Sequence, residues 1–250
     1  MISSLKKSER TLLEVLGRLL YATPEILEGW GIARHTTSRC LRPLLESGYI
    51  TLNNEVLPNI IGLTHKGAAV VDRQLPSGKG YKSWGAVSHR CRRNIAELLL
   101  REKHGRFTFN TRQYAYTLGL NPANREHIAL DESGTRYLVI LDDYLMYPRR
   151  IAHCWSRPHT PNKRYYHDLG SRRWRDVASR MIVVTTDIAQ VVRYEKVIGK
   201  SEHARQLLDK GESLKKIRDQ LQLKTASSVR SFAELPEIEI YSISPIWNIA

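Results

Sequence analysis

Apolar residues recur at helical spacing near the N-terminus: Leu12, Leu13, Leu16, Leu19 and Leu20. This spacing predicts an amphipathic helix. Thr23 then supplies an N-cap, Pro24 suits the first helical position and Glu25 adds an acidic first turn. A second helix is therefore expected from about Pro24 to Trp30, and Gly31 ends it.

A further amphipathic stretch runs from Thr36 to Leu45, and its polar face consists of small hydroxyls and arginines. Hydroxyl and guanidinium groups reach phosphates and base edges in the major groove, so this composition is typical of a recognition helix. The residues expected to contact DNA from this part of the chain are Arg34, Thr36, Thr37, Arg39 and Arg42.

Two short segments then read as strands, Gly48–Leu52 and Ile60–Thr64, before Lys66-Gly67 opens another helix. This order of elements is that of a winged helix, and the stretch from Leu41 to Gly67 resembles winged-helix transcription regulators. The alternative is a plain helical bundle that carries a hairpin. We expect this first domain to occupy residues 1–76.

A linker is indicated between Leu75 and Gly80, where two glycines, a proline and a serine interrupt the periodic segments. A second domain is therefore expected over residues 77–250. It begins with a long helix predicted from Trp84 to Lys103. The arginines of this helix would hold phosphate or form a solvated charged face.

Three segments in the middle of the chain read as strands: Glu126–Leu130, Arg136–Asp143 and Met181–Asp187. The second is a continuous apolar run, as expected for a strand buried on both faces of a mixed sheet. A helix-like segment, Trp174–Arg180, precedes the third. Ile238–Ile243 alternates and is expected to return to the same sheet, so the fold class is α/β (α+β).

Residues 203–235 resemble a second helix-turn-helix unit, which would then be an insertion in this sheet. Ser213 provides the N-cap of a short helix that ends near Gln222, and the next helix carries Val229 and Phe232 on its inward side. Ordinary helices packed on the central domain are the alternative. The residues expected to contact DNA here are Ser227, Ser228 and Arg230.

The chain carries a net charge of +14, and basic and aromatic residues are interleaved between positions 149 and 180. Basic groups neutralise phosphates and aromatic faces stack on unpaired bases. This segment therefore suits double-stranded DNA that is locally single-stranded, or a phosphate clamp on an intact duplex. The residues expected to bind DNA are Arg149, Arg150, Arg164, Tyr165, Tyr166, Arg172 and Arg173.

Several protein classes are excluded by what the sequence lacks. No apolar run approaches the ~20 residues that span a bilayer, and no apolar stretch of a signal peptide follows Met1, so we expect a cytoplasmic protein without membrane insertion. The odd number of cysteines, Cys40, Cys91 and Cys154, fits reduced thiols. No His-x-His triplet of a histidine-type relaxase and no Walker-type phosphate loop occurs.

The winged helix, the basic helix, the acidic strand end at Asp142-Asp143 and the apolar strand that closes with Val184-Thr185-Thr186 together resemble the replication-relaxation family. This family includes the C-class plasmid mobilisation relaxases, and the similarity covers most of residues 10–190. The resemblance implies a nuclease domain related to the PD-(D/E)xK restriction endonucleases. It also implies other relaxosome or replication proteins as partners.

The resemblance places Glu126 at the first carboxylate position of the family, Asp142 at the second and Tyr144 at the third, with Asp143 beside them. Glu126 and Asp142 would then hold Mg²⁺ or Mn²⁺, which polarises the scissile phosphate, while Tyr144 would attack phosphorus or orient water. The sequence departs from the family pattern, because Arg125-Glu126 replaces Pro-Asp and a tyrosine stands at the third position.

Three functions remain open at this point. The first is a relaxase-like enzyme that binds a specific duplex site and nicks one strand in a metal-dependent reaction. The second is a non-catalytic regulator of plasmid replication or transcription, built on an inactive nuclease fold. The third is a structural component of a larger nucleoprotein complex. The sequence favours the first by a narrow margin.

Overall fold

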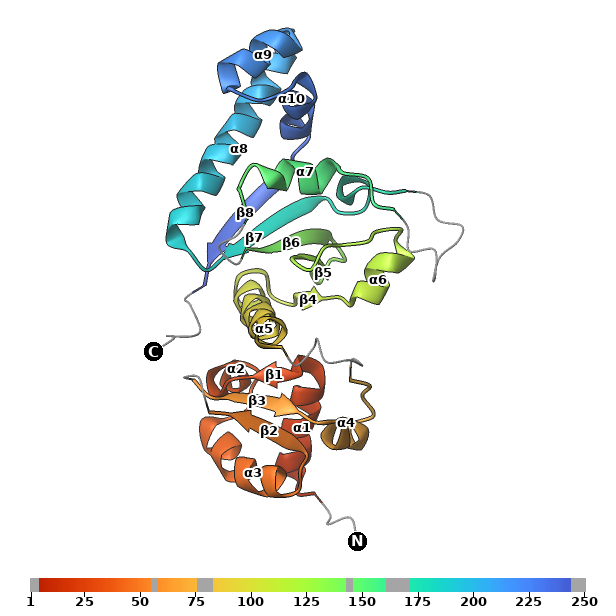
Figure 1. The fold of residues 1–250 in the computed structure, drawn as a ribbon, viewed down its shortest axis with the longest axis vertical. Helices are drawn as coiled ribbons and strands as arrows, with labels where there is room; N and C mark the ends of the chain where they lie inside the picture. The colour runs from red at the N-terminus through yellow and green to blue at the C-terminus, as the bar shows by residue number, and fades with distance from the viewer. Residues whose placement is uncertain (1–4, 55–57, 76–82, 143–145, 161–170, 244–250) are drawn as a thin grey trace. The chain divides into compact units, whose positions relative to one another are not determined.

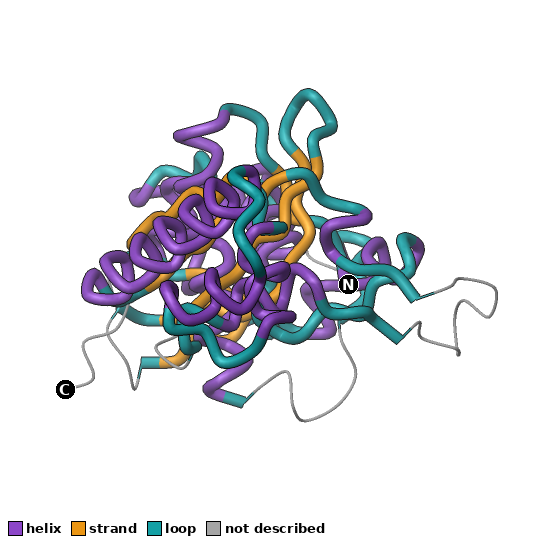
Figure 2. Tube along the Cα trace, turned by 90° about the horizontal axis from the view of Figure 1, so that it is seen from above, coloured by secondary structure: helices purple, strands orange, loops and turns teal. Residues whose placement is uncertain are grey.

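The computed structural model describes residues 5–54, 58–75, 83–142, 146–160 and 171–243. The described residues divide into two compact units, one within residues 1–102 and the other within residues 103–244. Helices and strands occur in both units (Figures 1 and 2), which confirms the expected mixed α/β class.

The first unit contains α1 (Lys7–Leu19), β1 (Tyr21–Ala22), α2 (Pro24–Gly29), α3 (Arg34–Glu46), β2 (Ile50–Asn53), β3 (Ile60–Leu63), α4 (His65–Val70) and most of α5 (Trp84–His104). Its described strands form an antiparallel sheet in the order β1-β3-β2. The predicted helices and the two predicted strands are therefore present, and β1 is an additional strand.

Local chemistry fixes where these elements begin. The Thr23 hydroxyl accepts a hydrogen bond from the Ile26 amide at the start of α2, as predicted, and Thr64 accepts one from Gly67 at the start of α4. Gly67 also allows a close approach, because a Cβ atom there would lie 2.1 Å from the Tyr49 carbonyl oxygen. The turn from β3 into α4 therefore requires a glycine.

Helix α5 belongs with the first unit over most of its length. Val87 and Cys91 join the hydrophobic core that α1, α2 and the sheet form around Leu12, Leu16 and Ile61. Asn94, which is buried in α5, donates hydrogen bonds from Nδ2 to the carbonyls of Leu19 and Tyr21 at 3.2 and 2.9 Å. The division between the units accordingly falls at 102/103, whereas the sequence places a linker near residues 75–80.

The second unit contains β4 (Thr108–Phe109), α6 (Arg112–Thr117), β5 (Glu126–Leu130), β6 (Arg136–Asp142), α7 (Arg150–Ser156), the 3₁₀ helix η2 (Trp174–Asp176), β7 (Arg180–Thr185), α8 (Ile188–Asp209), α9 (Leu214–Leu221), α10 (Ala226–Ala233) and β8 (Glu237–Ser242). The described strands form one sheet in the order β4-β5-β6-β7-β8. The pairs β6–β7 and β7–β8 are parallel, and the others are antiparallel.

One face of this sheet carries the larger hydrophobic core of the unit. Ile128, Ile140 and Val183 point to this face, where α7 contributes Trp155 and α8 contributes Tyr194. Trp174 of η2 is fully buried in the same cluster. The core therefore fixes α7, α8 and η2 over one face of the sheet, at the strand ends where the sequence places its acidic residues.

Helices α8, α9 and α10 lie between β7 and β8 in the chain, so this segment is an insertion in the sheet, as expected. Figure 1 shows α9 and α10 side by side at the far end of α8. Other expectations need correction. The segment Trp174–Arg180 is helical only over the short η2, and β7 begins at Arg180 and ends at Thr185.

Within the described parts of the chain, no helix combines the length and apolar character needed to cross a membrane.

Candidate functional site

The exposed face of α3 carries the basic residues predicted to bind DNA. Arg34, Arg39 and Arg42 are exposed, as are His35 and Ser38 between them, and the spacing of these residues places them on one side of the helix. Cys40 and Leu44 point to the core on the other side. Core packing therefore orients α3 so that a row of guanidinium groups faces solvent.

The arginines of α3 have weak or no ion-pair partners among the described residues. Arg42 pairs with Glu46 at 2.8 Å and Arg34 approaches Glu25 at 4.0 Å, and all four side chains are more than half exposed. Such surface pairs contribute only about 0–1 kcal/mol. A phosphate could replace either carboxylate at little cost.

Thr37 is a correction to the sequence prediction. Its side chain is 1% exposed, because Thr37 lies on the same side of α3 as Cys40 and Leu44. It therefore helps to fill the core and cannot contact a DNA groove from this position. Thr36 beside it is half-buried and stays at the edge of the exposed face.

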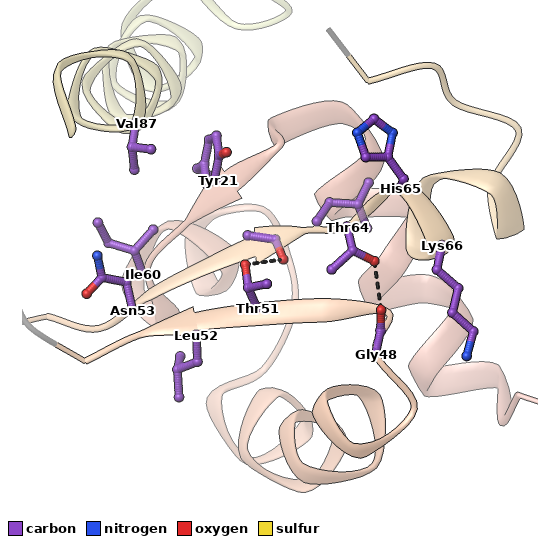
Figure 3. Close-up of a pocket in the computed structure, with 12 residues that line it drawn as sticks. Tyr21, Gly48, Thr51, Leu52, Asn53, Ile60, Thr64, His65, Lys66 and Val87 are labelled. Carbon is purple, nitrogen blue, oxygen red and sulfur yellow. Dashed lines mark hydrogen bonds between the residues drawn. The ribbon is translucent and has the colours of Figure 1, made fainter. Parts of the chain in front are cut away.

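A groove of about 470 Å³ runs along the first unit's sheet, and Val87 of α5 lines it together with the strands (Figure 3). His65 and Lys66 lie at one end, and Asn53 and Ile60 lie at the other. Thr51 and Thr64 each donate a hydrogen bond to a backbone carbonyl along it, to Gly62 and Gly48 respectively. The groove thus presents one cationic end next to the strand that precedes α4.

Glu126, the predicted first carboxylate, is 5% exposed and is surrounded by donors. Arg157 Nη2 lies 2.9 Å from Oε1 and 2.8 Å from Oε2 of Glu126. The Trp174 indole N–H and the Ala123 amide also donate to Oε2, at 3.0 and 3.1 Å. Both carboxylate oxygens are therefore already used within the protein.

Asp142, the predicted second carboxylate, is 1% exposed. Its Oδ2 accepts a hydrogen bond from the Tyr194 hydroxyl at 2.8 Å, and its Oδ1 accepts one from the Met146 amide at 3.1 Å. Burial and the adjacent Asp142 carboxylate raise the pKa of Tyr194, so this phenol stays protonated and keeps donating. Asp142 thus joins the end of β6 to α8.

The two carboxylates lie on the same face of the sheet but in separate surroundings. Glu126 of β5 pairs with Ile140 of β6, and Asp142 follows Ile140 by two residues. The described residues contain no cluster of three or more His, Cys, Asp or Glu side chains arranged to hold a metal ion. Asp143 and Tyr144 lie outside the described residues. Glu126 and Asp142, the residues predicted to hold Mg²⁺ or Mn²⁺, both accept hydrogen bonds from protein donors.

The basic segment after β6 is only partly described. Arg149 and Arg150 are exposed, and their guanidinium carbons lie 5.6 and 5.7 Å from the centroid of the exposed Tyr147 ring. Arg172 is exposed and Arg173 is half-buried. The predicted residues Arg164, Tyr165 and Tyr166 lie outside the described residues.

The predicted second helix-turn-helix corresponds to α9 and α10. The Thr225 hydroxyl caps α10 by accepting from the Ser228 amide, and Val229 and Phe232 are buried as predicted. Ser227 and Arg230 are exposed, whereas Ser228 is half-buried. Ser201 of α8 donates to the Phe232 carbonyl, so α10 is fixed to the helix on which it packs.

A cleft of about 520 Å³ in the second unit brings Arg150, which the sequence predicts to bind DNA, together with other basic residues. Arg125 lines it from the turn before β5, Arg150 and His153 line it from α7, and Arg157 lines it from the C-cap of α7. Arg150 and His153 are three positions apart, so they share one face of α7, and Arg157 directly follows the last residue of this helix. This spacing was visible in the sequence, but α7 itself was not predicted.

Cys154 also lines this cleft. Burial and the nearby Glu126 raise the pKa of its thiol to about 12, so it is protonated at neutral pH and is a poor nucleophile. The cleft therefore has the character of a binding site rather than of a thiol-based catalytic centre.

Comparisons of this chain with protein-family models, with curated proteins and with solved structures find no match.

Proposed function

We propose that this chain is a duplex-DNA-binding protein of the replication or transcription regulator type, and that its first unit is a winged helix with α3 as the recognition helix. The observation that carries the proposal is the exposed face of α3, where Arg34, Arg39 and Arg42 face solvent while the opposite side packs into the core. The net charge of +14 supports a polyanionic partner.

The order of elements in the first unit supports the winged-helix part of the proposal. Three helices with an intervening short strand are followed by the hairpin of β2 and β3, and β3 pairs with both β1 and β2. In such domains the third helix enters the major groove. The replication-relaxation family remains the family that we propose, and the second unit is the proposed counterpart of its nuclease-like domain.

The non-catalytic form of this function is preferred over a nickase. A metal-dependent nickase needs carboxylate oxygens that are free to coordinate the ion. Glu126 gives both oxygens to protein donors, and Asp142 is bound to Tyr194 and to the Met146 amide. We therefore propose a nuclease-like domain retained for its shape and charge.

The test is a fluorescence-anisotropy titration with duplex DNA from the intergenic region beside the protein's own gene. Arg39→Gln and Arg42→Gln should each weaken specific binding by about 1–3 kcal/mol, which is roughly tenfold or more. The matched control is Arg193→Gln on α8, which removes the same charge from another exposed position and should leave affinity nearly unchanged. Equal losses in all three variants would show that α3 is not the reading element.

A further inference from the structure

The cleft between α7 and the turn before β5 has an excess of positive groups. Glu126 is the acidic residue among those that line it, and Glu126 is already paired with Arg157. Among the described residues, no carboxylate lies within salt-bridge distance of Arg125 or Arg150. Within the described part of the chain, the cleft therefore offers an anion two guanidinium groups that have no carboxylate partner, together with the exposed His153 side chain.

These groups converge because the fold holds them in place. Arg157 is fixed by the buried carboxylate of Glu126, which is itself fixed by Trp174. Ile151, Ala152 and Trp155 anchor the other side of α7 in the core. Arg150, His153 and Arg157 are thus directed into the cleft without further adjustment. Guanidinium groups match the oxygens of a phosphate through paired hydrogen bonds.

An aromatic ring lies next to the same cleft. Tyr147 is 63% exposed, and Arg150, which lines the cleft, also lies over the Tyr147 ring. An exposed ring beside a phosphate-binding group is the arrangement by which proteins hold unpaired nucleotides, because the ring stacks on the base while the cation holds the backbone. The exposed Tyr147 ring therefore favours a nucleic-acid strand over free phosphate as the ligand of this cleft.

We propose that the cleft lined by Arg125, Arg150, His153 and Arg157 binds a backbone phosphate of a single nucleic-acid strand, with Tyr147 stacking on the adjacent base. The assignment to a strand rests on the proposed function, in which the chain acts on DNA. The site is separate from α3, and it uses neither a metal nor the Cys154 thiol. The cleft volume of about 520 Å³ suits one nucleotide.

The test is a competition assay on the full-length protein with a fluorescein-labelled thymidine hexanucleotide. Arg150→Gln combined with His153→Gln should weaken binding at least tenfold, whereas Arg193→Gln should change it less than threefold. Both cleft residues are exposed, so the folded state should be kept, and an unchanged thermal unfolding midpoint checks this. Equal effects of the double variant and the control would overturn the proposal, because binding would then follow overall charge.

Three competitors identify what the cleft holds. The unlabelled hexanucleotide should compete best, a hexamer without bases should compete less well, and inorganic phosphate should need millimolar concentrations. Tyr147→Ala should remove the difference between the hexamers with and without bases. Competition by inorganic phosphate as strong as by the hexanucleotide would overturn the assignment to a strand.

The two proposals fail independently. Arg39→Gln on α3 should leave hexanucleotide binding unchanged while it weakens duplex binding. Loss of duplex recognition with an intact cleft would contradict the proposed function alone, and the reverse pattern would contradict the cleft alone.

Discussion

Arg157 and Glu126 form a close ion pair in which a single guanidinium nitrogen, Nη2, contacts both carboxylate oxygens at 2.8 and 2.9 Å. The pair joins the C-cap of α7 to the first residue of β5, and the indole N–H of Trp174 adds a second donor. A divalent cation at Glu126 would have to displace these donors. Breaking a buried pair typically costs about 3–5 kcal/mol, although the partial exposure of Arg157 reduces this cost.

The first prediction concerns metals. Millimolar Mg²⁺ or Mn²⁺ should leave the thermal unfolding midpoint unchanged, because an ion would have to compete with the protein donors that hold the carboxylate oxygens of Glu126 and Asp142. Supercoiled plasmid that carries the cognate region should stay closed. Metal-dependent open circles that disappear in Asp142→Ala would contradict this and would restore the nickase hypothesis.

The second prediction concerns the hydrogen bond between Tyr194 and Asp142. Tyr194→Phe should lower the free energy of unfolding by about 1–3 kcal/mol, because it leaves a buried carboxylate oxygen short of a donor. Urea denaturation measures the change. Tyr114→Phe on α6 is the control, because Tyr114 is only half-buried and its hydroxyl makes no hydrogen bond to another described residue. A loss as large in Tyr114→Phe would show that the measurement does not report this bond.

The third prediction concerns Asn94. Asn94→Ala should destabilise the first unit by about 1–3 kcal/mol, because the carbonyls of Leu19 and Tyr21 each lose a buried donor. Duplex-DNA affinity of the folded fraction should stay the same, since Asn94 does not lie on α3. Hydrogen exchange should speed up in α5 and β1 before it does so in the second unit. Uniform acceleration in both units would argue against a local role.

The fourth prediction concerns thiol reactivity. Burial raises the pKa of Cys91 and of Cys154 to about 12, so both thiols are protonated at pH 8. Alkylation of both cysteines by iodoacetamide should be slow in the native protein and should accelerate about tenfold for each pH unit. The urea-unfolded protein is the control and should react rapidly. Fast native labelling at pH 8 would contradict the burial of these thiols.

The sequence predicts the first unit well because its signals are local. The hydroxyl cap at Thr23, the leucines at helical spacing in α1 and the two strand segments Gly48–Leu52 and Ile60–Thr64 are each predicted from residues that lie close together in the sequence. The prediction for Thr37 is wrong because it considers residue type alone, whereas the spacing of Thr37 to Cys40 and Leu44 places it on the buried side of α3.

The long helix α8 is not predicted from the sequence, for a different reason. Its buried positions have helical spacing, but they include Gln190 and Ser201 as well as Tyr194 and Val197. Polar residues at core positions hide the hydrophobic periodicity that sequence analysis relies on. The hydrogen-bond partners of Glu126 could not be predicted from the sequence either, because Arg157 and Trp174 lie far from Glu126 along the chain.

The insertion of α8–α10 between two adjacent parallel strands has a consequence for how the chain folds. Arg180 of β7 pairs with Glu237 of β8, so the last strand cannot join the sheet until all three helices have been synthesised. Until then β7 presents an open, strongly apolar edge, which is the kind of surface that recruits chaperones or other nascent chains. Two strands that lie so far apart in the sequence also pair slowly. Completion of β8 is therefore expected to be the late, rate-determining event in the maturation of the second unit.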